Sequence, residues 1–101
     1  MAHFIISFRI KSDNDYQKRY DSLTARVIEI AGSSGAVWDE TSSFFVMQAP
    51  TTAAGLCEDL YMNSAFNATK DIIVVIDLDN RKKATKGELK WQVILEKQLG
   101  F

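Results

Sequence analysis

The sequence contains very little cysteine, histidine and proline, and each scarcity excludes a class of structure or site. A single cysteine, Cys57, cannot form a disulfide within the chain or a cysteine-based zinc site, and we expect it to be a core thiol. A single histidine, His3, excludes a metal centre that needs two histidines. Pro50 is the only proline, and there are five glycines. We expect these residues to mark the ends of helices and strands and not the boundaries of domains.

Long apolar runs and an excess of one charge are also missing. The longest apolar run, residues 72–76, is far shorter than the roughly 20 residues that span a membrane. The first residues carry no basic stretch or cleavage site, so we expect no signal peptide and a cytoplasmic location. Twelve Lys and Arg oppose thirteen Asp and Glu, and the net charge of −1 argues against binding nucleic acid through bulk charge. No cofactor is expected.

The apolar pattern predicts one small α+β domain over residues 1–101. Alternation of Phe4, Ile6, Phe8 and Ile10 predicts a strand at about 3–11. The next segment, about 14–31, is predicted to be an amphipathic helix with its apolar stripe at Tyr16, Tyr20, Leu23, Val27 and Ile30. Lys18, Arg19, Arg26 and Glu29 are expected to lie off this stripe. The later patterns predict strands at 36–39 and 41–48, a helix at 52–63, a strand at 71–79 and a loop at 80–83.

The C-terminal segment, about 86–99, fits two structures. Leu89, Trp91 and Val93 alternate as they would in a strand. Thr85 and Glu88 have the spacing of a capping box, and Gly100 stands where a helix would stop. We prefer a helix.

This order of elements predicts a ferredoxin-like split βαβ sandwich, with an antiparallel or mixed sheet and the helices on one face. Right-handed crossovers are expected to place the first and third strands side by side and parallel. The other face of the sheet stays open and is the natural place for a homodimer. The residues expected at that interface are Ile5, Ser7, Arg9, Ile73, Val75 and Asp77.

Several segments resemble one family of small proteins. Residues 2–8 (AHFIISF), the helix start at 15–20 (DYQKRY) and the Trp-containing segment 37–46 are similar to the CRISPR-associated Cas-two family, and more closely to its SinR-like relatives. The polar turn and apolar strand at 67–78 also fit, so that the resemblance covers about residues 2–79. It implies a ferredoxin-like homodimer. Some relatives are metal-dependent nucleases, and others are structural parts of spacer-integration complexes.

The resemblance fails at the position that carries nuclease chemistry in that family. There, an aspartate at the end of the first strand holds a divalent cation across the dimer, whereas this chain has Arg9. A guanidinium stays protonated and repels a cation. Asp77 and Asp79 could form a substitute metal pair. Alternatively, Asp77 pairs with Arg9 across adjacent strands while Asp79 faces solvent, and we favour this second interpretation.

Two further groups of residues are candidates for binding a partner. The only basic cluster could contact phosphates, but a solvated surface is the commoner role of such a run, and no aromatic residues are interleaved for base stacking. This cluster comprises Arg81, Lys82, Lys83, Lys86 and Lys90. Three of these basic residues and three aromatic residues are the candidates for binding a partner: Arg81, Lys82, Lys83, Phe44, Phe45 and Trp91.

The sequence as a whole favours a non-catalytic homodimer that binds another protein and no membrane. On the resemblance, such a scaffold would serve a phage or mobile element as a modulator, in effect an inhibitor, of a host nucleic-acid defence system. One alternative is a divalent-metal nuclease that uses Asp77 and Asp79. The other is a nucleic-acid-binding accessory protein that uses Lys82 and Lys83.

Overall fold

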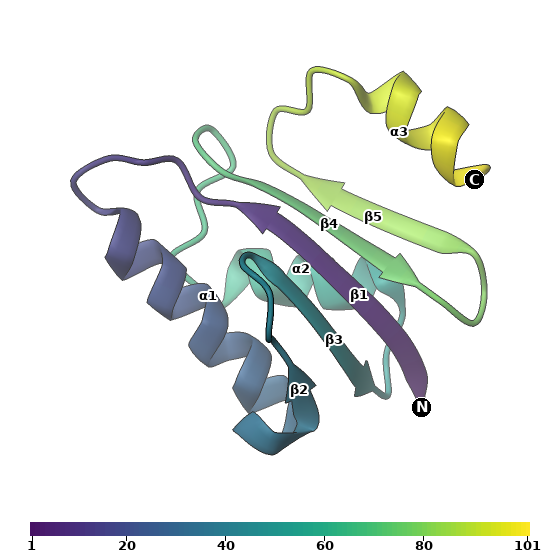
Figure 1. Ribbon diagram of the computed structural model, residues 1–101, viewed down its shortest axis with the longest axis horizontal. Coiled ribbons are helices and arrows are strands. Elements are labelled where there is room, and N and C mark those ends of the chain that lie inside the picture. The colour runs from purple at the N-terminus through teal and green to yellow at the C-terminus, as the bar shows by residue number, and fades with distance from the viewer.

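Five strands form a single antiparallel sheet with three α-helices in the computed structural model, which describes residues 1–101 (Figure 1). This α+β arrangement is consistent with the ferredoxin-like fold that the sequence predicts. The strands are β1 (Ala2–Arg9), β2 (Val37–Trp38), β3 (Phe44–Ala49), β4 (Ile72–Asp77) and β5 (Lys82–Lys86). The helices are α1 (Tyr16–Ala31), α2 (Ala53–Met62) and α3 (Gln92–Leu99), with a 3-10 turn at Ser34–Ala36. None of them combines the length and apolar character needed to cross a membrane.

Strand β1 supplies the centre of the core, as its alternating pattern predicts. Phe4 and Ile6 are fully buried, and Phe8 and Ile10 are almost so. The strand order is β2-β3-β1-β4-β5, so β1 lies in the middle of the sheet. Leu23 and Val27 of α1, together with Leu56 and Leu60 of α2, belong to the same buried cluster. The predicted stripe of α1 is therefore confirmed at its centre.

One polar residue of α1 is buried, against the expectation from its position off the apolar stripe. Arg19 is 5% exposed and pairs with Asp71, which is 1% exposed. Its Nε donates to Asp71 Oδ2 at 3.0 Å and its Nη2 to Asp71 Oδ1 at 3.2 Å. The backbone N–H groups of Lys11 and Asn67 also donate to this carboxylate. Each oxygen of the buried carboxylate thus accepts two hydrogen bonds, as burial of a charge requires, and the pair joins α1 to the start of β4.

The prediction that the first and third strands run parallel is wrong, because β1 pairs antiparallel with both β3 and β4. The crossover through α1 makes β2 run in the direction of β1, and the following hairpin reverses the chain into β3. The crossover through α2 then makes β4 run in the direction of β3. Parallel strands are therefore separated by an antiparallel neighbour.

The C-terminal segment forms a strand before it forms a helix. The expected loop at 80–83 and the first part of the expected helix are replaced by β5, which pairs with β4, and α3 begins only at Gln92. The helix is confirmed from there to Leu99. The lysine-rich sequence of β5 lacks the alternation of apolar and polar residues that would predict a strand. Pairing with the free edge of β4 determines its structure instead.

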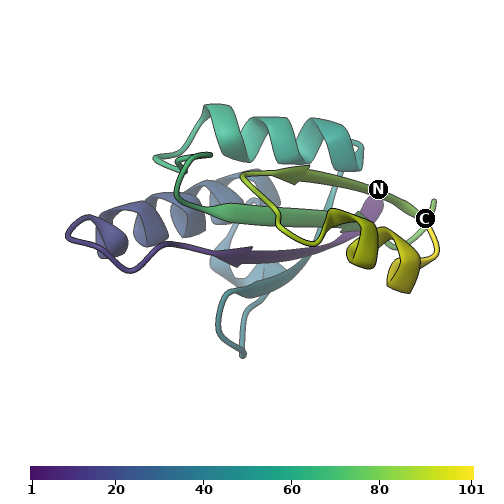
Figure 2. The ribbon, with the colours of Figure 1, turned by 90° about the horizontal axis from the view of Figure 1, so that it is seen from above.

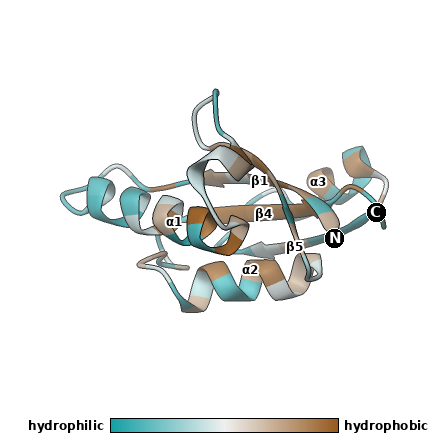
Figure 3. Ribbon diagram, turned by 90° about the horizontal axis from the view of Figure 1, so that it is seen from below, coloured by the Kyte–Doolittle hydropathy of each residue, from teal (hydrophilic) through white to brown (hydrophobic).

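Two segments project from the sheet on the side away from α2 (Figures 2 and 3). One is the β2–β3 hairpin with its loop at residues 39–43, and the other is α3, which lies at the β5 edge. The expectation that the helices share one face does not hold for α3. We call the sheet surface between these two projections the open face; it carries the odd-numbered residues of β1.

Candidate functional site: the open face of the sheet

A continuous row of apolar side chains crosses the open face. Ile5 of β1 lies opposite Val46 of β3 on one side and Ile76 of β4 on the other. Trp38 of β2 extends the row beyond Val46 and is 44% exposed. Ile5, Val46 and Ile76 are only partly buried. Four strands thus present adjacent apolar groups on a surface that the rest of the chain leaves partly open.

A second row runs beside the first and is equally free of charge. Ser7 of β1 lies opposite Phe44 and Val74, and Thr85 of β5 lies opposite Val74. The ring of Phe44 meets that of Trp38 edge to face at 6.1 Å between centroids. Charged side chains stand only at the margins of these rows: Lys83 lies opposite Ile76, and Arg9 follows Ser7 on the same face of β1. The middle of the open face is therefore uncharged and largely apolar.

Three of the six residues predicted for a dimer interface are on the opposite side of the sheet. Ile73 and Val75 are fully buried in the core, and Asp77 is 3% exposed. In the β1–β4 pair, the inward residues Phe4, Ile6 and Phe8 lie opposite these three odd-numbered residues. Cross-strand partners share a face, so the open-face residues of β4 are the even-numbered ones. Ile5, Ser7 and Arg9 do lie on the open face.

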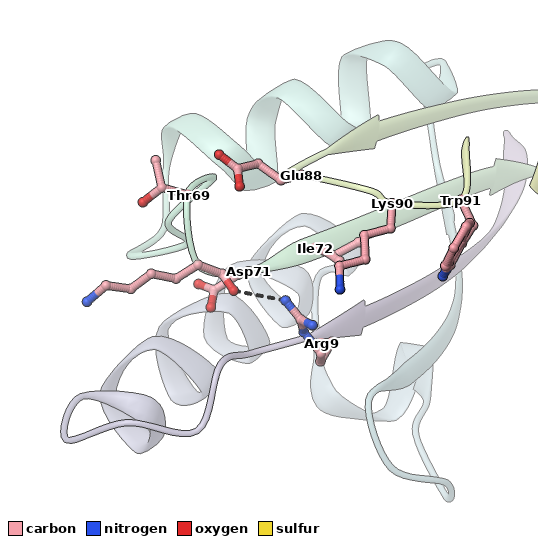
Figure 4. A pocket seen from close by; sticks show the side chains of 8 residues that line it. Arg9, Thr69, Asp71, Ile72, Glu88, Lys90 and Trp91 are labelled. Atoms are coloured by element: carbon pink, nitrogen blue, oxygen red, sulfur yellow. Dashed lines mark hydrogen bonds between the residues drawn. The ribbon is translucent and has the colours of Figure 1, made fainter. Parts of the chain in front are cut away.

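Arg9 and Asp77 do not form the predicted ion pair. Arg9 lies opposite Ile72, at the other end of β4 from Asp77, and its Nη2 donates to the carbonyl oxygen of Lys70 at 3.1 Å (Figure 4). The Asp77 carboxylate accepts hydrogen bonds from the backbone N–H of Asp79 and from both the backbone and the side chain of Asn80. The bonds from Asn80 hold the pKa of Asp77 below its usual value. Asp77 therefore organises the β4–β5 turn.

Asp79 likewise has a partner that the sequence did not indicate. Its carboxylate accepts a hydrogen bond from the backbone N–H of His3 at 2.7 Å and contacts the Nδ1 atom of His3 at 3.0 Å. These bonds lower the pKa of Asp79. Because β4 ends at Asp77, Asp77 and Asp79 do not lie on one face of a strand as predicted. The chain also has no group of three side chains that could hold a metal ion. This arrangement does not favour the metal pair.

The predicted basic cluster is dispersed over two faces and two ends of the sheet. Lys83 bonds to the carbonyl oxygen of Phe101 at 2.9 Å and pairs with Glu96 of α3. Lys86 pairs with Glu58 of α2 on the other side of the sheet. Arg81 lies over the ring of Phe101 and bonds to the oxygen of Gly100, and Lys82 is exposed. Lys90 stands apart, at the end of the sheet near Arg9.

The structure separates the three aromatic candidates. Phe45 is 4% exposed and stacks on Phe8, so it belongs to the core and cannot bind a partner. Phe44 is partly buried on the open face, and Trp91, just before α3, is 70% exposed. Cys57 is 1% exposed, as predicted, and its burial raises the pKa of the thiol to about 11. The thiol is therefore protonated at neutral pH and is a poor nucleophile.

Comparisons of the chain with known protein families, curated proteins and solved structures find no match. The resemblance to the Cas-two family therefore stays a prediction, and function must be argued from the site itself.

The two projections beside the open face carry complementary groups. The hairpin loop presents the exposed acids Asp39 and Glu40, next to Trp38. Helix α3 presents Val93 and Ile94, which are 76% and 54% exposed, together with the exposed Lys97, and Lys97 has no ion pair. Each projection thus combines apolar side chains with charge, and the two charges have opposite sign.

Proposed function

We propose that this chain is a non-catalytic protein-interaction module whose open face pairs with a second copy of the chain. The observation that carries the proposal is the uncharged centre of the open face, above all the row Trp38, Val46, Ile5 and Ile76. A contiguous apolar surface with a polar rim is typical of protein interfaces. Pairing would remove these side chains from water, which stabilises association by roughly 25 cal/mol per Å² of apolar surface.

The shape of the molecule favours a second copy as the occupant. The chain measures 36 × 33 × 24 Å, and Figure 1 views it down the shortest axis, with the sheet spread across the two longer dimensions. A stable interface needs about 800 Å² from each partner, which a face of this extent can supply. A twofold axis parallel to the strands would also place the hairpin of each copy against α3 of the other.

Charge complementarity supports the same arrangement. Asp39, Glu40 and Lys97 are exposed. That dimer would bring the two acids of one copy toward Lys97 of the other, and Trp38 toward Val93 and Ile94. Because the interface is isologous, each complementary contact occurs twice. Such rim charges fix the register of association, and the apolar centre contributes most of its free energy.

The contacts of the two candidate metal ligands support a binding role over a catalytic one. Asp77 is held by its own turn, and Asp79 is held by His3. These hydrogen bonds orient the two carboxylates toward their own turn and toward His3, and they leave fewer lone pairs for a cation. Arg9, at the position of the family's metal-binding aspartate, carries a permanent positive charge.

Size-exclusion chromatography with light scattering tests the proposal. We expect twice the mass of one chain for the wild type, and the mass of one chain for Ile5→Glu, which places a charge in the apolar centre. Met62→Glu is the matched control, because Met62 is 66% exposed on α2, and it should remain dimeric. If Ile5→Glu does not fold, Trp38→Glu serves in its place. A wild-type monomer at about 100 µM, or dimeric open-face variants, would refute the proposal.

Charge reversal tests the orientation of the two copies. Lys97→Glu and Glu40→Lys should each weaken the dimer, because each places like charges together at the rim. The double variant should recover wild-type association, since its charges are complementary again. Independent and additive effects of the two substitutions would contradict the twofold arrangement.

A further inference from the structure

A pocket of ≈370 Å³ lies at one end of the sheet, outside the two uncharged rows of the open face. It is formed where β1 ends, where β4 begins and where the loop after β5 leads into α3 (Figure 4). Its volume lies within the range of small-molecule sites. The residues that line it are Arg9, Thr69, Lys70, Asp71, Ile72, Glu88, Lys90 and Trp91.

Two cations converge in this pocket without a carboxylate between them. Figure 4 shows the ammonium of Lys90 extending toward the guanidinium of Arg9, which itself points to the carbonyl oxygen of Lys70. Neither side chain forms an ion pair, although the chain has eight such pairs elsewhere, and Arg9 makes one hydrogen bond to a backbone carbonyl. Like charges in proximity repel. An anion between them would remove that repulsion.

Of the two carboxylates that line the pocket, Glu88 forms no ion pair and Asp71 is committed to other partners. Asp71 is 1% exposed, and both of its oxygens are occupied by Arg19 and by backbone N–H groups. Its charge is thus compensated by Arg19. Lys70 is partly engaged by Asp13 at 3.4 Å. Arg9 and Lys90 are therefore the groups available to an anionic ligand.

The loop that carries Lys90 and Trp91 is held closely against the sheet. Gly87 has a φ of +102°, and a Cβ atom there would lie 2.1 Å from the carbonyl oxygen of Asp71. Only glycine allows this approach of the loop to the start of β4. The close contact fixes the loop where Lys90 and Trp91 face Arg9 across the pocket.

Trp91 gives the pocket an aromatic wall beside its cations. The side chain is 70% exposed and stands beside Lys90 in Figure 4, with no other aromatic ring stacked on it. An exposed indole is a platform for a planar base, and Glu88 supplies an acceptor for an amine or a hydroxyl group. We propose that this pocket binds a nucleoside phosphate, with the phosphate between Arg9 and Lys90 and the base against Trp91.

Isothermal titration calorimetry with adenosine monophosphate tests the site. We expect saturable binding of one ligand per chain with a Kd on the order of 0.1 mM. Inorganic phosphate and adenosine should each bind at least about tenfold more weakly, because each fills only half of the site. A short single-stranded oligonucleotide that competes with the nucleotide indicates a strand end as the ligand, and one that does not compete indicates a free nucleotide. No saturable binding at about 5 mM nucleotide would overturn the proposal.

Variants locate the bound nucleotide. Arg9→Ala and Lys90→Ala should each weaken binding by about tenfold, because each removes a charge-assisted hydrogen bond to the phosphate. Lys82→Ala is the matched control, since Lys82 is also exposed and lacks an ion pair but lies at the other end of β5, and it should bind as the wild type does. Equal affinity in all three variants would refute the site.

Fluorescence gives a second readout at Trp91. The chain has two tryptophans, so Trp38→Phe leaves Trp91 as the only one. The nucleotide should change its emission, and Arg9→Ala should shift this titration to higher concentration. Unchanged Trp91 emission at a saturating concentration would contradict stacking. Ile5→Glu should bind the nucleotide normally, so failure of the dimer and failure of this pocket are distinguishable.

Discussion

Among single residues, Asp71 carries the largest expected energetic effect. It is the buried partner of Arg19 and also accepts two backbone N–H groups. Asp71→Ala would leave the buried guanidinium with Asp13 as its only carboxylate partner and would remove the acceptor of the Lys11 and Asn67 N–H groups. We expect the free energy of unfolding to fall by about 3–5 kcal/mol. Chemical denaturation monitored by circular dichroism measures this loss.

A matched substitution separates this effect from the general loss of a carboxylate. Asp21 is exposed on α1 and accepts one hydrogen bond, from Gln17. Asp21→Ala should change the free energy of unfolding by less than about 0.5 kcal/mol. If the two variants were equally stable, the Arg19–Asp71 pair would not be an essential connection between α1 and β4.

Asp77 gives the fold a defined dependence on pH. Its pKa in the folded chain is lowered by bonds from Asn80 and the backbone, so the folded state binds fewer protons than the unfolded state. The stabilisation is therefore present above the unfolded pKa of about 3.9 and is lost as the pH falls through the folded pKa. Asp77→Asn keeps an oxygen for the two backbone donors, removes the titration, and should reduce the loss of stability on acidification.

Thermal melts at about pH 6 and about pH 3 test this prediction. The melting temperature of Asp77→Asn should fall less between the two values than that of the wild type. Asp21→Asn, at a carboxylate that faces solvent, should follow the wild type. An identical acid response in all three proteins would show that Asp77 does not contribute to it.

The sequence predicted burial of individual residues better than their partners. Alternation placed Phe4 and Ile6 in the core, and helical spacing placed Leu23 and Val27 there. Burial of Arg19 was not predictable, because its partner is 52 residues away and neither residue belongs to a local motif. The adjacent Phe44 and Phe45 had to face opposite sides of a strand, but only the register shows that Phe45 faces the core.

Among the elements, the loop between β5 and α3 depends most on one backbone position. Gly87 and Gly32 both have φ near +100°, but a Cβ at Gly32 would meet nothing within 4 Å. Gly32→Ala should therefore cost only the strain of the left-handed conformation, about 1–2 kcal/mol. Gly87→Ala adds a clash with Asp71 and Ile72 and should cost about 1–3 kcal/mol more.

Urea unfolding of the two variants measures the difference between them. Because both substitutions impose the same residue on almost the same φ, the difference isolates the close approach of the loop to β4. Equal losses of stability would mean that the loop can move away freely. In that case, the position of Lys90 and Trp91 would not be fixed by Gly87.

The elements also show where a pattern in the sequence is insufficient. Strand β5 contains three lysines and no large apolar residue, so its formation depends on the unpaired edge of β4. For the candidate site, Ile5, Ser7 and Arg9 were correctly placed on one face of β1. Ile73 and Val75 were assigned to the wrong face, because an uninterrupted apolar run such as β4 gives no sign of which side turns inward.

At the scale of the whole molecule, the proposed dimer would couple association to stability. Pairing through the open face would stabilise only the folded chain, so the melting temperature of the wild type should rise with protein concentration. Ile5→Glu should melt at a temperature independent of concentration. Differential scanning calorimetry over about a hundredfold range of concentration measures both. A wild-type melting temperature that does not vary would contradict a folded dimer.

The composition of β5 has a consequence for how far such association can extend. An exposed edge strand can recruit further strands and begin a fibre, and lysines on an edge oppose this because added strands would bring like charges together. Here one outer edge carries Lys82, Lys83 and Lys86, and the other, β2, is only two residues long. The sheet therefore resists the addition of strands at either edge, and the proposed dimer would remain a particle of finite size.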